Sequence, residues 1–129
     1  MSNKILVADD DLYLLDSLSA RLKAEGYQVI AVQDSYQAVD HARTGWPDLL
    51  LLDINMPAGD GFTVQDRVGN MTHMRGIPVI YLTGDKSQRV IKLAKAYHAF
   101  ALLYKPFETS ELLSTIADAL DSRRTFEVA

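Results

Sequence analysis

Residues 5–11 read ILVADDD: four apolar residues run directly into three aspartates, Asp9, Asp10 and Asp11. A short, unbroken apolar run is typical of a β-strand that is covered on both faces. Neighbouring carboxylates raise one another's pKa, so three in a row are unfavourable unless they face open solvent or a cation lies among them. The stretch therefore predicts a buried strand that ends at a polar site.

Apolar runs of four or five residues recur along the chain, and they are Ile5–Ala8, Val29–Val32, Leu49–Leu52, Val79–Leu82 and Phe100–Tyr104. Helical spacing of apolar residues follows each run, in the sets Leu15, Leu18 and Leu22; Ala38, Val39 and Ala42; Phe62, Val64 and Val68; Val90, Leu93, Ala94 and Tyr97; and Leu112, Leu113, Ile116 and Leu120. This alternation predicts an α/β fold: a doubly wound, five-stranded parallel sheet with five helices, in three layers. Ser35 is expected to cap the second helix, and Thr109 or Ser110 the fifth.

Composition narrows the class of protein. A chain of 129 residues predicts one domain. The net charge of −4 and the lack of a basic cluster of the kind nucleic-acid binders carry argue against direct nucleic-acid binding. The absence of cysteine excludes disulfides, cysteine-ligated zinc and a thiol nucleophile, and it fits a reducing compartment. With no secretory signal and no apolar run near 18 residues, we expect a soluble, cytoplasmic protein without membrane attachment.

Polar residues follow four of the five predicted strands, and they are Asp9, Asp10 and Asp11; Asp53; Thr83 and Asp85; and Lys105. Because parallel strands end at the same edge of a sheet, these side chains should converge on one crevice. Carboxylate oxygens without histidine or cysteine suit Mg²⁺ or Mn²⁺ and not zinc. Asp53 ends a central strand and can serve as a nucleophile that forms an acyl phosphate, with Thr83 and Lys105 holding phosphoryl oxygens.

Four stretches, ILVADDD, LLLLDINMPAGDGF, PVIYLTG and YKPF, stand in an order and at separations that resemble the receiver domains of two-component response regulators, over nearly all of residues 3–122. The resemblance implies the flavodoxin-like strand order 2-1-3-4-5. It also implies a signalling switch that takes a phosphoryl group from a phosphohistidine on a histidine kinase or phosphotransfer protein. Such a protein is not an enzyme, although it catalyses its own phosphorylation and dephosphorylation.

The resemblance assigns the metal ligands by position. Asp53 becomes the phosphoacceptor, and Asp10 and Asp53 bind Mg²⁺ through their carboxylates. Asn55 contributes its backbone carbonyl, and Asp9 acts mainly through water. Asp11 has no role in the family, so we expect it to begin or cap the first helix.

The resemblance also assigns the groups that respond to phosphorylation. Thr83 receives a phosphoryl oxygen, and Lys105 pairs with the phosphoryl group. The peptide bond between Lys105 and Pro106 is expected to be cis. Asn55 and Asp85 stand at the two positions that tune the lifetime of the phosphorylated state. An amide and a carboxylate there help to position an attacking water, which predicts a short lifetime.

The sequence departs from the family at Leu102, where a tyrosine or phenylalanine is usual and is believed to swing inward as Thr83 moves. Leucine cannot act as a rotating aromatic, which puts this coupling in doubt. Tyr104 shares the strand parity of Leu102 and is the candidate substitute, although ordinary packing also explains it. His98 stands where glycine is common, and histidine tolerates a positive φ better than most side chains.

In this family the usual readout surface is formed by the fourth helix, the fifth strand and the fifth helix. We expect it to bind a downstream protein or a covalently linked output domain, or to form a homodimer. The expected domain covers residues 1–122, and residues 123–129 form a tail or the start of a linker.

Two other functions stay open at the level of the sequence. One is a receiver-shaped interaction module that works without phosphorylation, which Leu102 permits. The other is a Mg²⁺-dependent phosphatase with an aspartate nucleophile. That class needs a second aspartate two residues further on as general acid, and this chain has Asn55 there. A flavodoxin-like cofactor site is disfavoured because the three aspartates would repel phosphate.

Overall fold

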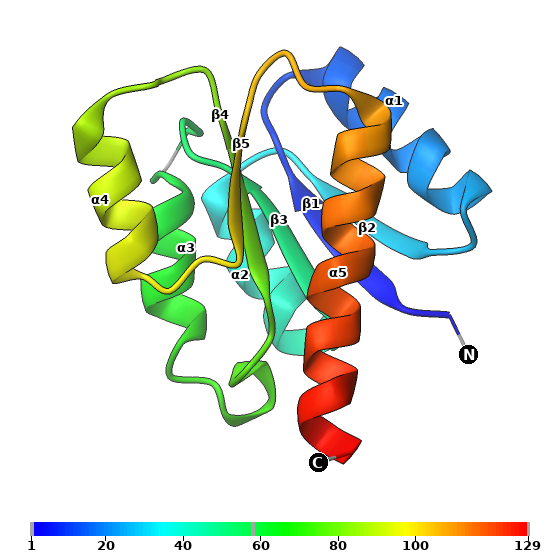
Figure 1. The fold of residues 1–129 in the computed structure, drawn as a ribbon. Helices are drawn as coiled ribbons and strands as arrows, with labels where there is room; N and C mark the ends of the chain where they lie inside the picture. The colour runs from blue at the N-terminus through cyan, green and yellow to red at the C-terminus, as the bar shows by residue number, and fades with distance from the viewer. Residues whose placement is uncertain (1, 58, 129) are drawn as a thin grey trace.

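The computed structural model describes residues 2–57 and 59–128, with side chains described up to residue 122 (Figure 1). In chain order the elements are β1 (Lys4–Ala8), α1 (Leu12–Ala24), β2 (Gln28–Val32), α2 (Ser35–Gly45), β3 (Leu49–Asp53), α3 (Gly61–Val68), the 3-10 turn η1 (Thr72–Met74), β4 (Val79–Thr83), α4 (Gln88–Ala96), β5 (Ala101–Tyr104) and α5 (Thr109–Val128). Because α5 continues past residue 122, the expected tail is helical up to Val128. Whether residues 123–129 start a linker stays a prediction.

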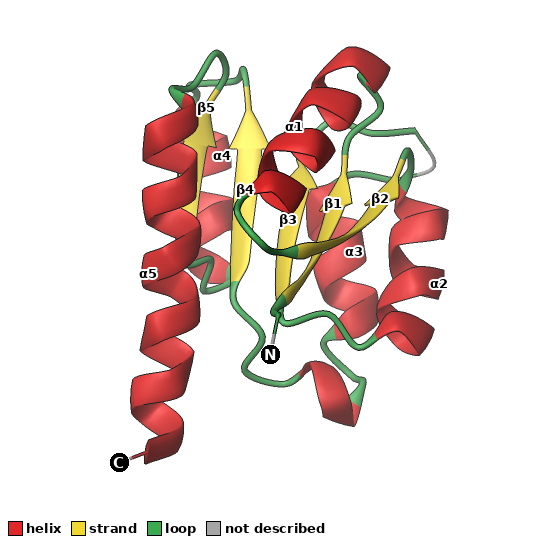
Figure 2. Cartoon of the chain, turned by 90° about the vertical axis from the view of Figure 1, so that its right-hand side faces the viewer, coloured by secondary structure: helices red, strands yellow, loops and turns green. Residues whose placement is uncertain are grey.

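The five strands form one parallel sheet in the order β2-β1-β3-β4-β5, which confirms the predicted order. Their arrowheads point the same way in Figure 2, so that all carboxyl ends lie along one edge. Along that edge Asp53 is paired with Leu82, and Thr83 with Tyr104. The register therefore fixes the spacing of the predicted site residues before any side chain is considered.

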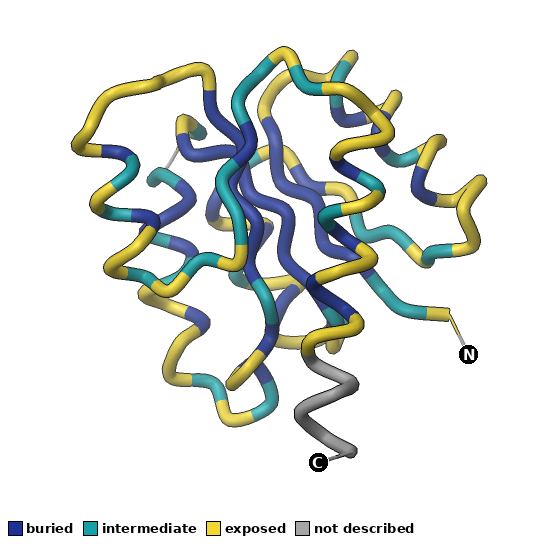
Figure 3. Tube along the Cα trace, viewed as in Figure 1, coloured by how far each residue is buried: buried dark blue, intermediate teal, exposed yellow. Residues whose placement is uncertain are grey.

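Helices cover both faces of the sheet, which makes the predicted three layers (Figures 1 and 2). Strands β3 and β4 are buried along their whole length, as expected for central strands with two covered faces (Figure 3). Successive side chains point to opposite faces, so each strand contributes to two separate cores. One core lies under α1 and α5, and the other lies under α2, α3 and α4.

The ends of the helices agree only in part with the sequence analysis. Asp11 caps α1, as predicted, by accepting two backbone N–H groups. Ser35 does not cap α2: Asp34 does, and Ser35 is the first helical residue, buried. Ser87 caps α4. Thr109 and Ser110 are the first two residues of α5, so both predicted caps lie inside the helix instead of before it.

Candidate functional site

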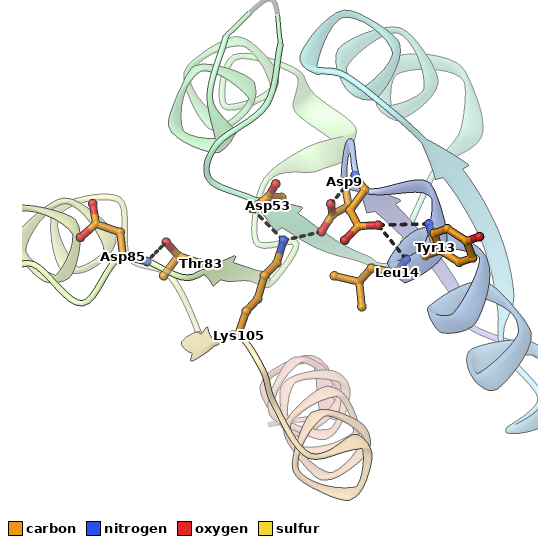
Figure 4. Close-up of polar contacts among 8 residues, drawn as sticks. Asp9, Tyr13, Leu14, Asp53, Thr83, Asp85 and Lys105 are labelled. Atoms are coloured by element: carbon orange, nitrogen blue, oxygen red, sulfur yellow. Dashed lines mark hydrogen bonds and ion pairs between the residues drawn. The ribbon is translucent and has the colours of Figure 1, made fainter.

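The predicted site residues meet at the carboxyl edge of the sheet. Asp9 follows β1, Asp53 and Thr83 end β3 and β4, and Lys105 follows β5. Figure 4 shows Asp9, Asp53 and Lys105 pointing toward one another from three different strands. The convergence expected from strand alternation is therefore present in the fold.

Lys105 joins the two buried carboxylates. Its Nζ donates to Asp9 Oδ2 at 2.9 Å and lies 3.3 Å from Asp53 Oδ1. Asp9 is fully buried and Asp53 is 4% exposed. Burial lowers the pKa of Lys105, but the hydrogen bond to Asp9 and the charge of Asp53 outweigh it, so that the pKa is raised overall. The ammonium is therefore held charged between two carboxylates.

One ammonium does not balance the acidic cluster. Asp9, Asp10 and Asp53 each offer a carboxylate oxygen, and these oxygens lie within 4.8 Å of one another. Burial, followed by the charge of Asp9, raises the pKa of Asp53 to about 6, and Lys105 offsets only part of this rise. Such an oxygen-only donor set, with charge left over, fits a hard divalent cation. The three aspartates were expected to need either open solvent or a cation among them. Lys105 supplies part of this positive charge from within the protein.

Thr83 and Asp85 are engaged with the backbone instead of with the acidic cluster. Thr83 is fully buried, and its hydroxyl accepts the backbone N–H of Asp85 at 2.9 Å. The Asp85 carboxylate accepts the backbone N–H of Ser87 at 2.8 Å, and this hydrogen bond lowers the pKa of Asp85. Both side chains are turned away from Lys105 in Figure 4. Of the two predicted partners of a phosphoryl group, Lys105 therefore contacts the acidic cluster, whereas the Thr83 hydroxyl is bonded to the backbone.

The remaining predicted residues lie around this centre. Asn55 is exposed in the bend after β3. Leu102 is partly buried against the core under α4, and Tyr104 lies beside Thr83 on the neighbouring strand. The Lys86 ammonium lies 5.6 Å from the centre of the Tyr104 ring. These positions do not test the roles that the resemblance assigns.

Two local expectations are met. The bond between Lys105 and Pro106 is cis. His98 has a φ of 58°, in the left-handed region that glycine favours.

Sequence reasoning missed three features of the site. Gly61 passes so close to β3 that a Cβ there would lie 2.9 Å from the carbonyl oxygen of Asp53. Tyr81 reads as one more apolar strand residue, yet its ring packs against that glycine. A cavity of about 350 Å³ opens beside Lys105, and its lining comprises Asp11, Leu14, Lys105, Pro106 and Phe107. Of these three features, only Gly61 could have been recognised in the sequence, as a glycine directly before a helical pattern.

No helix among the described residues is long and apolar enough to cross a membrane.

Comparison with known proteins places the chain in a family. The model of the response regulator receiver domain matches residues 5–117. The transcriptional regulatory protein PdtaR of Mycobacterium tuberculosis is 30% identical over 122 residues, which are 94% of this chain. The chain spans 58% of the length of that relative.

Solved structures of similar fold agree. A receiver domain protein from Methanospirillum hungatei has a TM-score of 0.91 at 26% identity, covering 97% of this chain and 98% of the other. The chemotaxis regulator CheY4 of Vibrio cholerae has a TM-score of 0.86 at 28% identity, covering 92% and 99%. The receiver domain of sensor histidine kinase PA1611 from Pseudomonas aeruginosa, with a magnesium ion in its active site cleft, has a TM-score of 0.85 at 26% identity, covering 94% and 99%. This chain therefore belongs to the response regulator receiver domain family.

Proposed function

We propose that this receiver domain is a phosphorylation-activated switch whose phosphoacceptor is Asp53, in the cytoplasm alongside a histidine kinase or phosphotransfer protein. The observation that carries the proposal is the position of Lys105, whose ammonium bridges Asp9 and Asp53 at 2.9 and 3.3 Å. A buried carboxylate held next to a fixed positive charge is the arrangement that receives a phosphoryl group without large rearrangement.

The transfer step needs little chemistry from the protein. A carboxylate oxygen of Asp53 attacks the phosphorus of the partner's phosphohistidine. As the new P–O bond forms, the P–N bond breaks. The electron pair of the P–N bond stays on the imidazole, which takes up a proton from water. Lys105 stays paired with Asp9 and gains the phosphoryl oxygens, so that transferred charge is balanced as it arrives.

The acidic cluster would hold Mg²⁺ or Mn²⁺. We propose that Asp10 and Asp53 ligate through carboxylates, Asn55 through its carbonyl, and Asp9 through water. The bound cation would supply neutralising charge for the phosphoryl oxygens. The oxygen-only donor set supports this choice, as does the magnesium ion in the similar Pseudomonas aeruginosa receiver.

Thr83 would read the state of Asp53. Its hydroxyl, which here accepts the N–H of Asp85, would donate its own proton to a phosphoryl oxygen and move toward it, and the loop that leads to α4 follows. A phosphoryl group adds about −1.5 to −2 charges, so a conformation that binds it better becomes the populated one. As this loop moves, the Asp85 segment helps Asn55 to position the water that attacks phosphorus, releasing inorganic phosphate and the Asp53 carboxylate.

Within the proposed readout surface of α4, β5 and α5, helix α4 and the loop before it carry a distinctive charge. Lys86, Arg89, Lys92 and Lys95 are all exposed, and residues 86–98 contain no acidic residue although the chain is acidic overall. None of the four forms an ion pair with any residue that the structure describes. An apolar groove of about 200 Å³ lies beside them, and its lining comprises Ile91, Ala94, Lys95, Ala99, Ala101 and Leu102. We propose that the downstream protein or output domain presents an acidic, amphipathic surface here, with homodimerisation through the same face as the competing use.

The deciding experiment combines the protein with Mg²⁺ and acetyl phosphate or phosphoramidate, and follows intact mass alongside Asp53→Asn. A single phosphate adduct on the wild type, absent from the variant and decaying over minutes, is the expected result. If no donor gives an adduct while Mg²⁺ still binds, the domain works as an interaction module without phosphorylation. An adduct that persists for many hours contradicts the roles proposed for Asn55 and Asp85.

A further inference from the structure

Leu102 occupies the position where the family usually carries a switching aromatic, and its neighbour across the sheet is an aromatic residue. Tyr81 on β4 is paired with Leu102 on β5, and two residues further along Thr83 is paired with Tyr104. Because side chains alternate along a strand, all four face the same side of the sheet. An aromatic ring is therefore present beside the usual place, on the strand that carries Thr83 itself.

The Tyr81 hydroxyl is the unusual feature of this core. Tyr81 is fully buried, and no residue that the structure describes forms a hydrogen bond with its hydroxyl. A buried hydroxyl without a partner is unfavourable, and phenylalanine would fill the same space without that cost. Burial, then Tyr97 and the charges of Asp60 and Asp66, raise the pKa of Tyr81, so that the hydroxyl stays a proton donor at any physiological pH.

The Tyr81 ring has contacts in both directions. On one side a Cβ at Gly61 would lie 3.3 Å from two ring carbons, which puts the ring close behind the backbone of Asp53. On the other side the ring centre lies 4.8 Å from that of Phe62 on α3, and Phe62 is stacked at 5.2 Å on Tyr97, next to the end of α4. The series ends at the Tyr97 hydroxyl, which donates to Asp66 at 2.9 Å.

We propose that Tyr81 is a positioning residue for the phosphorylation switch, replacing the aromatic that Leu102 lacks: its hydroxyl gains a hydrogen bond in the phosphorylated conformation that it does not have here. The proposal rests on Asp53 being the phosphoacceptor.

The coupling follows from the geometry of β4. When the Thr83 hydroxyl moves to donate to a phosphoryl oxygen, the end of the strand shifts, and Tyr81 is two residues back on the same face. A small shift moves the ring against Phe62 and toward the polar groups of Tyr97 and Asp66. Since a ligand shifts a population only by its differential affinity, a hydrogen bond made in one conformation alone favours that conformation. The stack then passes the change to α4.

The test compares Tyr81→Phe with the matched variant Tyr104→Phe, which removes the hydroxyl of the rival candidate. Fluoroberyllate with Mg²⁺ serves as the stable phosphoryl analogue, and its affinity is measured by titration for wild type and both variants. Tyr81→Phe should bind the analogue about fivefold more weakly, the size of one net neutral hydrogen bond, and Tyr104→Phe should bind as wild type. Without the analogue, the unfolding midpoint of Tyr81→Phe should equal or exceed that of the wild type.

A direct readout uses tyrosine labelled with ¹³C at Cζ, with the Tyr81 signal assigned by its loss in Tyr81→Phe. Addition of the analogue should shift this signal, because hydrogen bonding of a phenol changes the shielding of Cζ. Unchanged analogue affinity overturns the proposal. A lowered midpoint of the free variant also overturns it, because the hydroxyl would then already be bonded in the free conformation. Loss of affinity in Tyr104→Phe alone transfers the role to Tyr104. If the wild type itself binds no analogue, the proposed phosphorylation fails instead, which separates the two ideas.

Discussion

The two faces of the sheet are packed differently. Under α1 and α5 every buried side chain of the core is aliphatic, and these residues are Ile5, Val7, Leu15, Leu18, Leu22, Leu49, Leu51, Ile80, Leu82, Leu103, Leu112, Ile116, Ala119 and Leu120. Under α2, α3 and α4 the core also contains the rings of Phe62 and Tyr81 and a buried hydroxyl.

The difference separates support from response. An aliphatic core at crystal-like density has no alternative bonding arrangement, so it holds the strand ends in place. The opposite core contains the Tyr81 hydroxyl, which can gain a hydrogen-bond partner, and a series of ring contacts that ends beside α4. Packed regions with two discrete arrangements are what switches use. We therefore infer that one face supports the site and that the other responds to its state.

The largest effect is expected from Ile116→Ala, on the supporting face. Ile116 is fully buried in α5, and truncation leaves a cavity that should lower the free energy of unfolding by about 2–5 kcal/mol. Affinity of the folded protein for Mg²⁺ and fluoroberyllate should stay within twofold of wild type. Denaturant unfolding and titration measure the two quantities. Ile116→Val is the graded control and should lower the free energy of unfolding by about 0.5–1.5 kcal/mol. A large change in the analogue affinity of Ile116→Ala would contradict the distinction between the two faces.

Gly61→Ala should have the next largest effect, on the responding face. The added Cβ would lie 2.9 Å from the Asp53 carbonyl oxygen and 3.3 Å from the Tyr81 ring, so backbone or ring must shift. We expect a loss of about 1–3 kcal/mol of stability, typical of overpacking. Unlike Ile116→Ala, this variant should also weaken analogue binding, because the displaced groups lie behind Asp53, the proposed phosphoacceptor. Gly84→Ala, where an added Cβ meets nothing within 4 Å, should leave stability within about 0.5 kcal/mol.

Asp53→Asn should stabilise the metal-free protein at pH 7.5. Folding raises the pKa of Asp53 from 3.8 to about 6, so its contribution to stability is present below pH 4 and lost as the pH rises through 6. Replacing the carboxylate removes that penalty, and we expect a gain of about 1–2 kcal/mol, limited because Lys105 loses one of its two partners. Unfolding curves from pH 4 to 8 should show the gain shrinking toward zero at the acidic end. A variant less stable than wild type at pH 7.5 would contradict the repulsion inferred among the aspartates.

Much of the fold followed from the sequence because the relevant signals are local. An apolar run such as Leu49–Leu52 is recognised from its own residues alone. Because the strands are parallel, the residues at their carboxyl ends, Asp53, Thr83 and Lys105, then lie on one edge of the sheet. The predicted cap at Ser35 was wrong by one position. Asp34 lies directly before the helix, and its side chain accepts a backbone N–H of the first turn.

The rest of the site depends on directions in space that no spacing encodes. Lys105 lies 96 positions from Asp9 along the chain, yet its ammonium reaches that carboxylate and not only Asp53. Tyr81 is an ordinary member of the run Val79–Leu82 until the sheet register puts it beside Leu102. The expected weakness at Leu102 could be read from sequence, but the candidate that compensates for it could not.

The smallest effect is expected from His98→Gly, between α4 and β5. His98 has a φ of 58°, which costs a residue with a Cβ about 1–2 kcal/mol, and glycine removes that strain but loses more entropy on folding. The net gain in stability should be about 0.5 kcal/mol, while His98→Ala, which keeps the strain, should show none. Because the left-handed turn only ends the helix, analogue affinity should not change, and calorimetric unfolding with a parallel titration measures both. A gain in stability coupled to weaker analogue binding would mean that this turn itself differs between the two conformations, which would extend the responding face to the start of β5.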